Sequence, residues 1–140
     1  MQSILVVDDE KSIRESLTGI LQDEGFTPAS VDSGEKAIEK ISEDRPDLIL
    51  LDIWMPGMDG LETLTTIRDI YPDQLVVMMS GHGTIETAVE ALKRGAVDYL
   101  VKPLDIEGLR VRAALDSQHE VLQAVSLLQL QFFSRKRRHT

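Results

Sequence analysis

The sequence predicts an α/β protein with a doubly wound parallel sheet of five strands and helices on both faces. Short apolar runs alternate with longer segments whose apolar residues recur at helical spacing, which is typical of strand–helix units. Three of the runs are apolar at every position, as expected of strands that are covered on both faces. Since crossover connections are right-handed in nearly all such proteins, only a few doubly wound strand orders are compatible with this pattern.

Five segments are expected to be strands. The three fully apolar runs are residues 4–7, 48–51 and 75–79, and these are expected to be central. Residues 27–31 form a weaker run, and residues 99–101 form a short final one. Each run has the length of an ordinary strand and is followed by a segment of different periodicity.

Four helices are expected between the strands, at residues 11–24, 34–43, 61–70 and 84–94, and a fifth is expected from about residue 105. Their apolar stripes include Ile13, Leu17, Ile20 and Leu21 in the first; Ala37, Ile38 and Ile41 in the second; Leu64 and Ile67 in the third; and Ile85, Ala88, Val89 and Leu92 in the fourth. Gly25 and Gly95 lie where helices should end, and Ser33 and Thr84 lie where helices should begin.

Composition excludes several classes of function. The 140 residues and 42% hydrophobic content fit one folded domain, while 15 Lys+Arg against 24 Asp+Glu give a net charge of −9. We therefore expect this domain to bind neither nucleic acid nor a membrane directly. The chain has no cysteine, so disulfides and thiolate metal sites are excluded. The N-terminal segment lacks the basic region and apolar length of a signal peptide, and we expect a cytoplasmic protein.

Three acidic residues should meet at one edge of the sheet. Asp8 and Asp9 follow the first strand and Asp52 ends the third. The carboxyl ends of parallel strands share an edge, so these side chains converge if the two strands are neighbours. Three carboxylates at about 4 Å repel by several kcal/mol per pair at intermediate dielectric, and a cation would offset this. Oxygen ligands alone favour Mg²⁺, with Mn²⁺ as an alternative.

Two further strands end in residues that suit a phosphoryl group. Ser80 ends the fourth strand and is followed by Gly81, whose backbone N–H is open to a ligand, and Lys102 ends the fifth. A hydroxyl, a backbone N–H and an ammonium group can each hold a phosphoryl oxygen. Asp52 is the expected nucleophile, because a carboxylate can attack phosphorus and form an acyl phosphate. The adjacent pair Asp8 and Asp9 has the charge density that a cation needs.

Four motifs in order resemble the receiver domain of bacterial two-component response regulators. They are VVDDE at residues 6–10, LLDIWMPGMDG at 50–60, SGHG at 80–83 and DYLVKPL at 98–104, and the resemblance extends over residues 3–109. It implies a flavodoxin-like fold with strand order 2-1-3-4-5. It also implies a regulatory phosphoacceptor domain in place of an enzyme with turnover.

The resemblance implies a role for each residue of the expected site. Asp52 would be the phosphoacceptor and a metal ligand, Asp9 a direct Mg²⁺ ligand, Asp8 a ligand through water, and the backbone carbonyl of Trp54 a further ligand. Lys102 and the backbone of Gly81 would contact the phosphoryl group. Ser80 and Tyr99 would form the switch pair, in which the hydroxyl turns toward the phosphoryl group and the ring follows it inward.

Residues 80–109 look most like receivers of the nitrogen-regulation class of transcriptional activators. The expected partners are a sensor histidine kinase and an output domain or partner protein that binds the face of the fourth helix and fifth strand. Two other functions stay open: a Mg²⁺-dependent phosphatase or phosphotransferase with an aspartate nucleophile, and an interaction module that needs no phosphorylation. The first is disfavoured because such enzymes space two aspartates one residue apart on a single loop, whereas Asp8 and Asp9 are adjacent.

The C-terminal part of the chain differs from the rest. We expect a receiver domain at residues 1–117 and an extension at residues 118–140, which is a continued helix followed by the basic tail SRKRRHT. The apolar residues after Gln118 fit either the end of a terminal helix or a linker and dimer seam, so a homodimer stays open. The tail is expected to be a solvated terminus, which is more common than a nucleic-acid contact.

Overall fold

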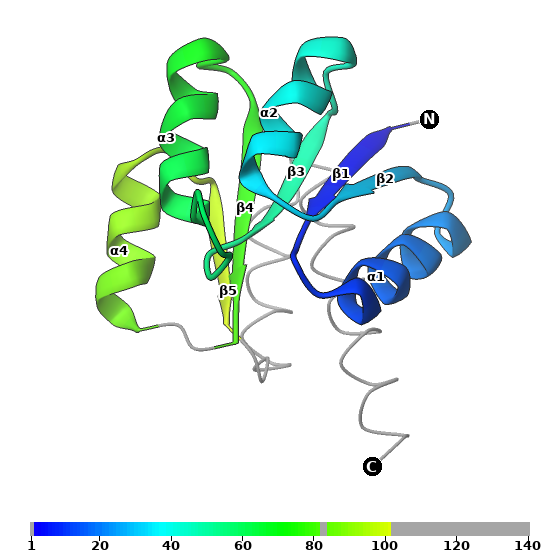
Figure 1. Cartoon of the computed structure of the whole chain (residues 1–140), viewed down its shortest axis with the longest axis horizontal. Helices are drawn as coiled ribbons and strands as arrows, with labels where there is room; N and C mark the ends of the chain where they lie inside the picture. The colour runs from blue at the N-terminus through cyan, green and yellow to red at the C-terminus, as the bar shows by residue number, and fades with distance from the viewer. Residues whose placement is uncertain (1, 82–83, 102–140) are drawn as a thin grey trace. The chain divides into compact units, whose positions relative to one another are not determined.

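The structure is a computed structural model that describes residues 2–81 and 84–101 (Figure 1). Its elements are β1 (Ser3–Val7), α1 (Lys11–Asp23), β2 (Thr27–Val31), α2 (Gly34–Glu43), β3 (Leu48–Asp52), α3 (Gly60–Ile70), β4 (Leu75–Ser80), α4 (Ile85–Lys93) and β5 (Asp98–Val101). The predicted alternation is therefore confirmed within these residues. The fifth helix, the boundary at residue 117 and the basic tail lie outside them.

All five strands form one parallel sheet in the order β2-β1-β3-β4-β5. Strand β1 lies between β2 and β3, so Leu5 is paired with both Ala29 and Ile49. The chain moves from β1 to β2 on one side and then to β3 on the other, which makes the β1–β3 boundary the point where the strand order reverses. The doubly wound fold class and the order 2-1-3-4-5 are confirmed.

Both faces of the sheet are covered. One apolar cluster joins alternate residues of β1, β3 and β4 with buried residues of α2, α3 and α4, including Leu5, Ile49 and Leu64. The intervening strand residues, such as Val6 and Leu50, point to the other face and are also buried. Helix α1 contacts β1 and β2, and Figure 1 shows it separated by the sheet from α2, α3 and α4.

The ends of the helices follow the expected cap residues. The side chain of Ser33 accepts a hydrogen bond from the Lys36 N–H at the start of α2, and Thr84 caps α4 in the same way. Asp59 caps α3, so this helix begins at Gly60, one residue before the predicted start. Gly25 and Gly95 follow α1 and α4 with φ angles of 89° and 102°, which is the left-handed conformation that glycine adopts most readily.

Candidate functional site

The three aspartates lie together at the carboxyl edge of the sheet. Asp8 directly follows β1, Asp9 is next to it, and Asp52 is the last residue of β3. One carboxylate oxygen from each residue can be chosen so that all three atoms lie within 4.8 Å of one another. Asp8 is buried, Asp52 is half-buried and Asp9 is exposed, so the cluster has one open side. The structure thus brings together the carboxylates that the sequence predicts to converge.

Hydrogen bonds fix Asp8 through its main chain and its side chain. Its N–H donates to the carbonyl oxygen of Val31 on β2, at 3.2 Å. Its carbonyl oxygen accepts from Nη1 of Arg14 on α1, at 2.8 Å, and its Oδ1 accepts from the N–H of Glu10, at 2.9 Å. Because these bonds run to β2, to α1 and back to the loop itself, the loop that carries Asp8 and Asp9 is held in one position relative to the sheet.

Asp52 is held by the strand before it and the loop after it. The four preceding residues of β3 are buried, and the N–H of Ile53 donates to the carbonyl oxygen of Met79 on β4, at 3.1 Å. The loop then returns, and the N–H of Gly60 donates to the carbonyl oxygen of Ile53, at 2.8 Å. A Cβ at Gly60 would lie 2.2 Å from the carbonyl oxygen of Asp52, so only glycine fits this close approach.

The charge and donor set of this cluster fit a hard cation. Three ionised carboxylates repel by a few kcal/mol per pair at an effective dielectric constant of about 20. Oxygen atoms alone are the donors that Mg²⁺ and Mn²⁺ prefer. Asp8, Asp9 and Asp52 are therefore residues that could hold a metal ion. Trp54, two residues after Asp52, is 53% exposed, so its ring is not part of the core.

Asp32 at the end of β2 lies outside this cluster. Nζ of Lys36 lies 3.0 Å from Oδ1 of Asp32, and the hydrogen bond within this ion pair lowers the pKa of the Asp32 carboxyl. Arg14 adds a weaker effect in the same direction. Both residues of the pair are largely exposed, so we regard this contact as a surface ion pair that contributes little to stability.

The remaining predicted residues lie at or near the same edge, as far as the structure describes them. Ser80 ends β4 and is 1% exposed, while Gly81 after it is exposed. Ser80 is paired with Val101 of β5, which directly precedes Lys102 in the chain. Tyr99 is 5% exposed, and its hydroxyl lies 3.2 Å from Oγ1 of Thr87 on α4. Lys102 itself lies outside the described residues.

Sequence reasoning missed the contacts of three residues that shape this region. Arg14 holds the backbone of Asp8, Gly60 permits the close approach at Asp52, and Thr87 contacts Tyr99. Arg14 and Thr87 look like ordinary helix residues in the sequence, and nothing in the spacing shows their partners. The sequence does mark the position of Gly60, because this glycine directly follows Asp59, a residue type that often caps helices.

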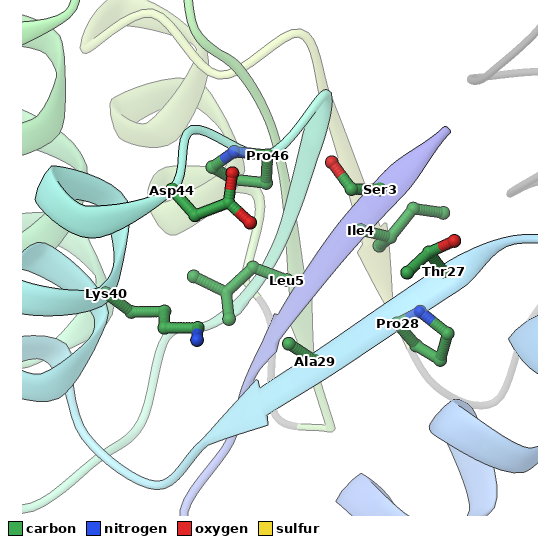
Figure 2. Close-up of a pocket in the computed structure, with 9 residues that line it drawn as sticks. All are labelled: Ser3, Ile4, Leu5, Thr27, Pro28, Ala29, Lys40, Asp44 and Pro46. Atoms are coloured by element: carbon green, nitrogen blue, oxygen red, sulfur yellow. The ribbon is translucent and has the colours of Figure 1, made fainter. Parts of the chain in front are cut away.

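A separate cavity of about 90 Å³ lies between β1, β2 and the end of α2 (Figure 2). It is lined by Ser3, Ile4, Leu5, Thr27, Pro28, Ala29, Lys40, Asp44 and Pro46. Small-molecule sites usually measure a few hundred Å³ or more, and in such sheets they lie at the carboxyl ends of the strands. This cavity is smaller and includes the amino ends of β1 and β2, so we assign it no ligand.

Comparison with known proteins gives consistent matches. The family model described as "Response regulator receiver domain" matches residues 4–114. The nitrogen assimilation regulatory protein NtrX of Azorhizobium caulinodans is 48% identical over 110 residues, which cover 77% of this chain and 24% of that protein. The transcriptional regulatory protein ZraR of Escherichia coli is 42% identical over 120 residues, which cover 84% of this chain and 27% of that protein.

Solved structures agree with the sequence matches. The crystal structure of the receiver domain of NtrX from Brucella abortus has a TM-score of 0.71 and 43% identity, and covers 83% of this chain and 98% of that chain. The structure of the chemotaxis protein CheY4 of Vibrio cholerae has a TM-score of 0.72 and 32% identity. The match covers 80% of this chain and 95% of that chain. These neighbours confirm the flavodoxin-like architecture.

The curated relatives are much longer than this chain. The chain spans about a quarter of the length of the curated relatives that it matches. In the part of the chain that the structure describes, no helix has the length and apolar character needed to cross a membrane. The family match covers most of the chain and includes every element of the sheet. The chain therefore belongs to the response regulator receiver domain family, a family of signalling domains of two-component systems.

Proposed function

We propose that this domain is a phosphoacceptor switch in which Asp52 receives a phosphoryl group from a sensor histidine kinase. The observation that carries the proposal is the convergence of Asp8, Asp9 and Asp52 within 4.8 Å at the carboxyl edge of the sheet. The phosphorylated domain would then control a transcription-activating output domain. The relatives NtrX and ZraR, a nitrogen assimilation regulatory protein and a transcriptional regulatory protein, support that output.

The proposed cofactor is Mg²⁺, with Mn²⁺ as an alternative, held by Asp8, Asp9, Asp52 and the backbone carbonyl of Trp54. The donor set supports this assignment, because it consists of hard oxygen atoms at a site with one exposed side. When bound, the cation neutralises charge on the phosphoryl oxygens and on the carboxylates.

Asp52 is the proposed nucleophile because of how it is held. Its strand is buried, and its loop is closed by the Gly60 N–H, so its main chain has a fixed position at the carboxyl edge of the sheet. A carboxylate oxygen forms the new bond to phosphorus as the bond from phosphorus to the donor breaks. In the proposed site the Ser80 hydroxyl, the Gly81 N–H and the Lys102 ammonium group each contact a phosphoryl oxygen.

Ser80 and Tyr99 are the proposed switch pair, and α4 with β5 is the proposed output face. Helix α4 exposes Ile85, Val89 and Leu92, at 85%, 44% and 50%, and these recur at helical spacing. Such an exposed apolar stripe supports a protein-binding role. We further propose that the receiver domain extends over residues 1–117 and that residues 118–140 form a linker helix and a basic tail.

The proposal is tested by incubation with a small acyl phosphate and Mg²⁺, followed by mass spectrometry of the intact chain. One phosphoryl group per molecule is expected on the native chain, and none on Asp52→Asn, which keeps the shape of the side chain. Asp69→Asn is the matched control, because Asp69 is exposed on α3 away from the cluster, and it should be modified as the native chain is. Multiple-turnover phosphate release would favour an enzyme, and no modification of the native chain would refute both functions.

A further inference from the structure

The first turn of α4 is closed by two threonines that bind each other reciprocally. Oγ1 of Thr84 accepts from the N–H of Thr87, at 3.1 Å, and Oγ1 of Thr87 accepts from the N–H of Thr84, at 2.9 Å. This is a capping box, in which glutamate or glutamine more often occupies the third helical position. The start of α4 therefore depends on two short hydroxyl side chains, and Thr87 is the one that also faces the sheet.

The same hydroxyl is contacted from the sheet. Tyr99 on β5 is 5% exposed, and its phenolic oxygen lies 3.2 Å from Oγ1 of Thr87, which is half-buried. The two residues are twelve positions apart and belong to different layers. The proposed switch tyrosine and the cap of α4 thus both form hydrogen bonds with one atom, Oγ1 of Thr87.

The hydrogen-bonding capacity of Thr87 makes this sharing restrictive. A hydroxyl has one proton and two lone pairs. The Thr84 N–H uses one lone pair, and the carbonyl oxygen of Thr84, 2.9 Å from Oγ1 of Thr87, is an acceptor for the proton. With the proton donated there, one lone pair is left for two hydroxyl groups, those of Tyr99 and Thr84, whose oxygens each lie 3.2 Å from Oγ1 of Thr87. Only one of them can donate to it at a time.

We propose that Thr87 is a positioning residue that links the location of Tyr99 to the first turn of α4. This inference rests on the function proposed above. When Tyr99 is seated against α4, its phenol donates to Thr87; when Tyr99 withdraws, the Thr84 hydroxyl takes its place. Only the bond to Tyr99 joins the sheet to α4, and phosphorylation is proposed to favour this seated arrangement, so loss of the bond disfavours the phosphorylated state.

Contacts at the other end of α4 explain why the coupling acts at the start of the helix. Nη2 of Arg68 on α3 donates to the carbonyl oxygen of Gly95, at 2.5 Å, and Nη1 of Arg94 donates to Oγ1 of Thr65, at 3.2 Å. These bonds tie the end of α4 to α3. The first turn, which carries the 85% exposed Ile85, is the part that can respond to Tyr99.

The test measures binding of beryllofluoride, a mimic of the phosphoryl group, in the presence of Mg²⁺. Trp54 is the only tryptophan of the chain and lies two residues from Asp52, so its fluorescence reports on this site. Thr87→Val keeps the shape of the side chain and removes the hydroxyl, and we expect it to weaken beryllofluoride binding about two- to fivefold, the effect of one neutral hydrogen bond. Thr87→Ser keeps the hydroxyl and should bind within about twofold of the native chain.

A double-mutant cycle separates coupling from loss of the cap. Tyr99→Phe should weaken binding as Thr87→Val does, and the double variant should be no weaker than either single variant, because both remove the same bond. Mg²⁺ affinity should be unchanged in all three. Effects that multiply, or a Thr87→Val variant that binds as the native chain does, would overturn the inference. If Thr87→Val does not fold, Thr87→Ala carries the same expectation.

Failure of the inference is distinguishable from failure of the proposed function. A native chain that does not respond to beryllofluoride and Mg²⁺ would refute the phosphoacceptor proposal and remove the basis of this one. A native response with no coupling between Thr87 and Tyr99 would refute only the role of Thr87.

Discussion

Gly60→Ala tests whether the loop after β3 sets the position of Asp52. The added Cβ would lie 2.2 Å from the Asp52 carbonyl oxygen and 2.7 Å from the Cα of Ile53, and both contacts are with backbone atoms that cannot rotate away. An ordinary contact needs more than 3 Å, so the loop or the end of β3 must shift by about 1 Å. Such overpacking typically lowers the free energy of unfolding by about 1–3 kcal/mol. The greater helix propensity of alanine offsets at most about 1 kcal/mol of this loss at the first position of a helix.

Urea unfolding and phosphoryl labelling together read out this substitution. We expect Gly60→Ala to lower the free energy of unfolding by about 1–3 kcal/mol and to slow labelling of Asp52 by tenfold or more, because a displacement of about 1 Å disturbs the alignment of a nucleophile. Gly19→Ala is the matched control. Nothing lies within 4 Å of its added Cβ in α1, so it should stabilise the chain by about 0.5–1 kcal/mol and leave labelling unchanged. Native stability and native labelling in Gly60→Ala would refute the argument.

Two further substitutions test the acidic cluster and a helix cap. Asp8→Asn keeps an oxygen for the Glu10 N–H but removes one of three converging charges, so the metal-free chain should gain about 1 kcal/mol in urea unfolding and lose most of its stabilisation by Mg²⁺. Equal stabilisation of both chains by Mg²⁺ would contradict the assignment of Asp8. Ser33→Ala removes the acceptor for the Lys36 N–H and should cost about 1 kcal/mol in the same assay, whereas Ser42→Ala in the last turn of α2 should cost less; equal costs would contradict the capping argument.

The strands and helices, and the sheet edge at which the site lies, could be predicted from the sequence because both depend on local patterns. Fully apolar strands such as residues 48–51 can be stable only when they are covered on both faces, and that condition implies a parallel sheet with helices on each side. A parallel sheet then brings all the residues that end its strands to one edge. The position of Asp8 beside Asp52 follows once β1 and β3 are neighbours, and the order of the strands was supplied by the family resemblance.

The contacts of single side chains could not be predicted in this way. Thr87 was one polar residue in an amphipathic helix, and its contact with Tyr99 depends on how α4 lies over β5. Arg14 has a partner six residues earlier in the chain, at the carbonyl oxygen of Asp8, which no periodicity reveals. Periodicity determines which face of a helix is buried, but the neighbour of each side chain depends on the three-dimensional register between layers.

The strand order places the acidic residues on one side of Asp52 and the proposed switch pair on the other. Asp52 ends β3, whose neighbour β1 supplies Asp8 and Asp9 on one side. On its other side β4 carries Ser80, and β5 beyond it carries Tyr99. Because the Asp8 N–H bonds to Val31 of β2, movement of β1 or β2 would disturb the proposed cation site. On the other side the Ile53 N–H bonds to Met79 of β4, but β5 lies one strand further from Asp52, and we infer that the proposed response to phosphorylation travels through β5 toward α4.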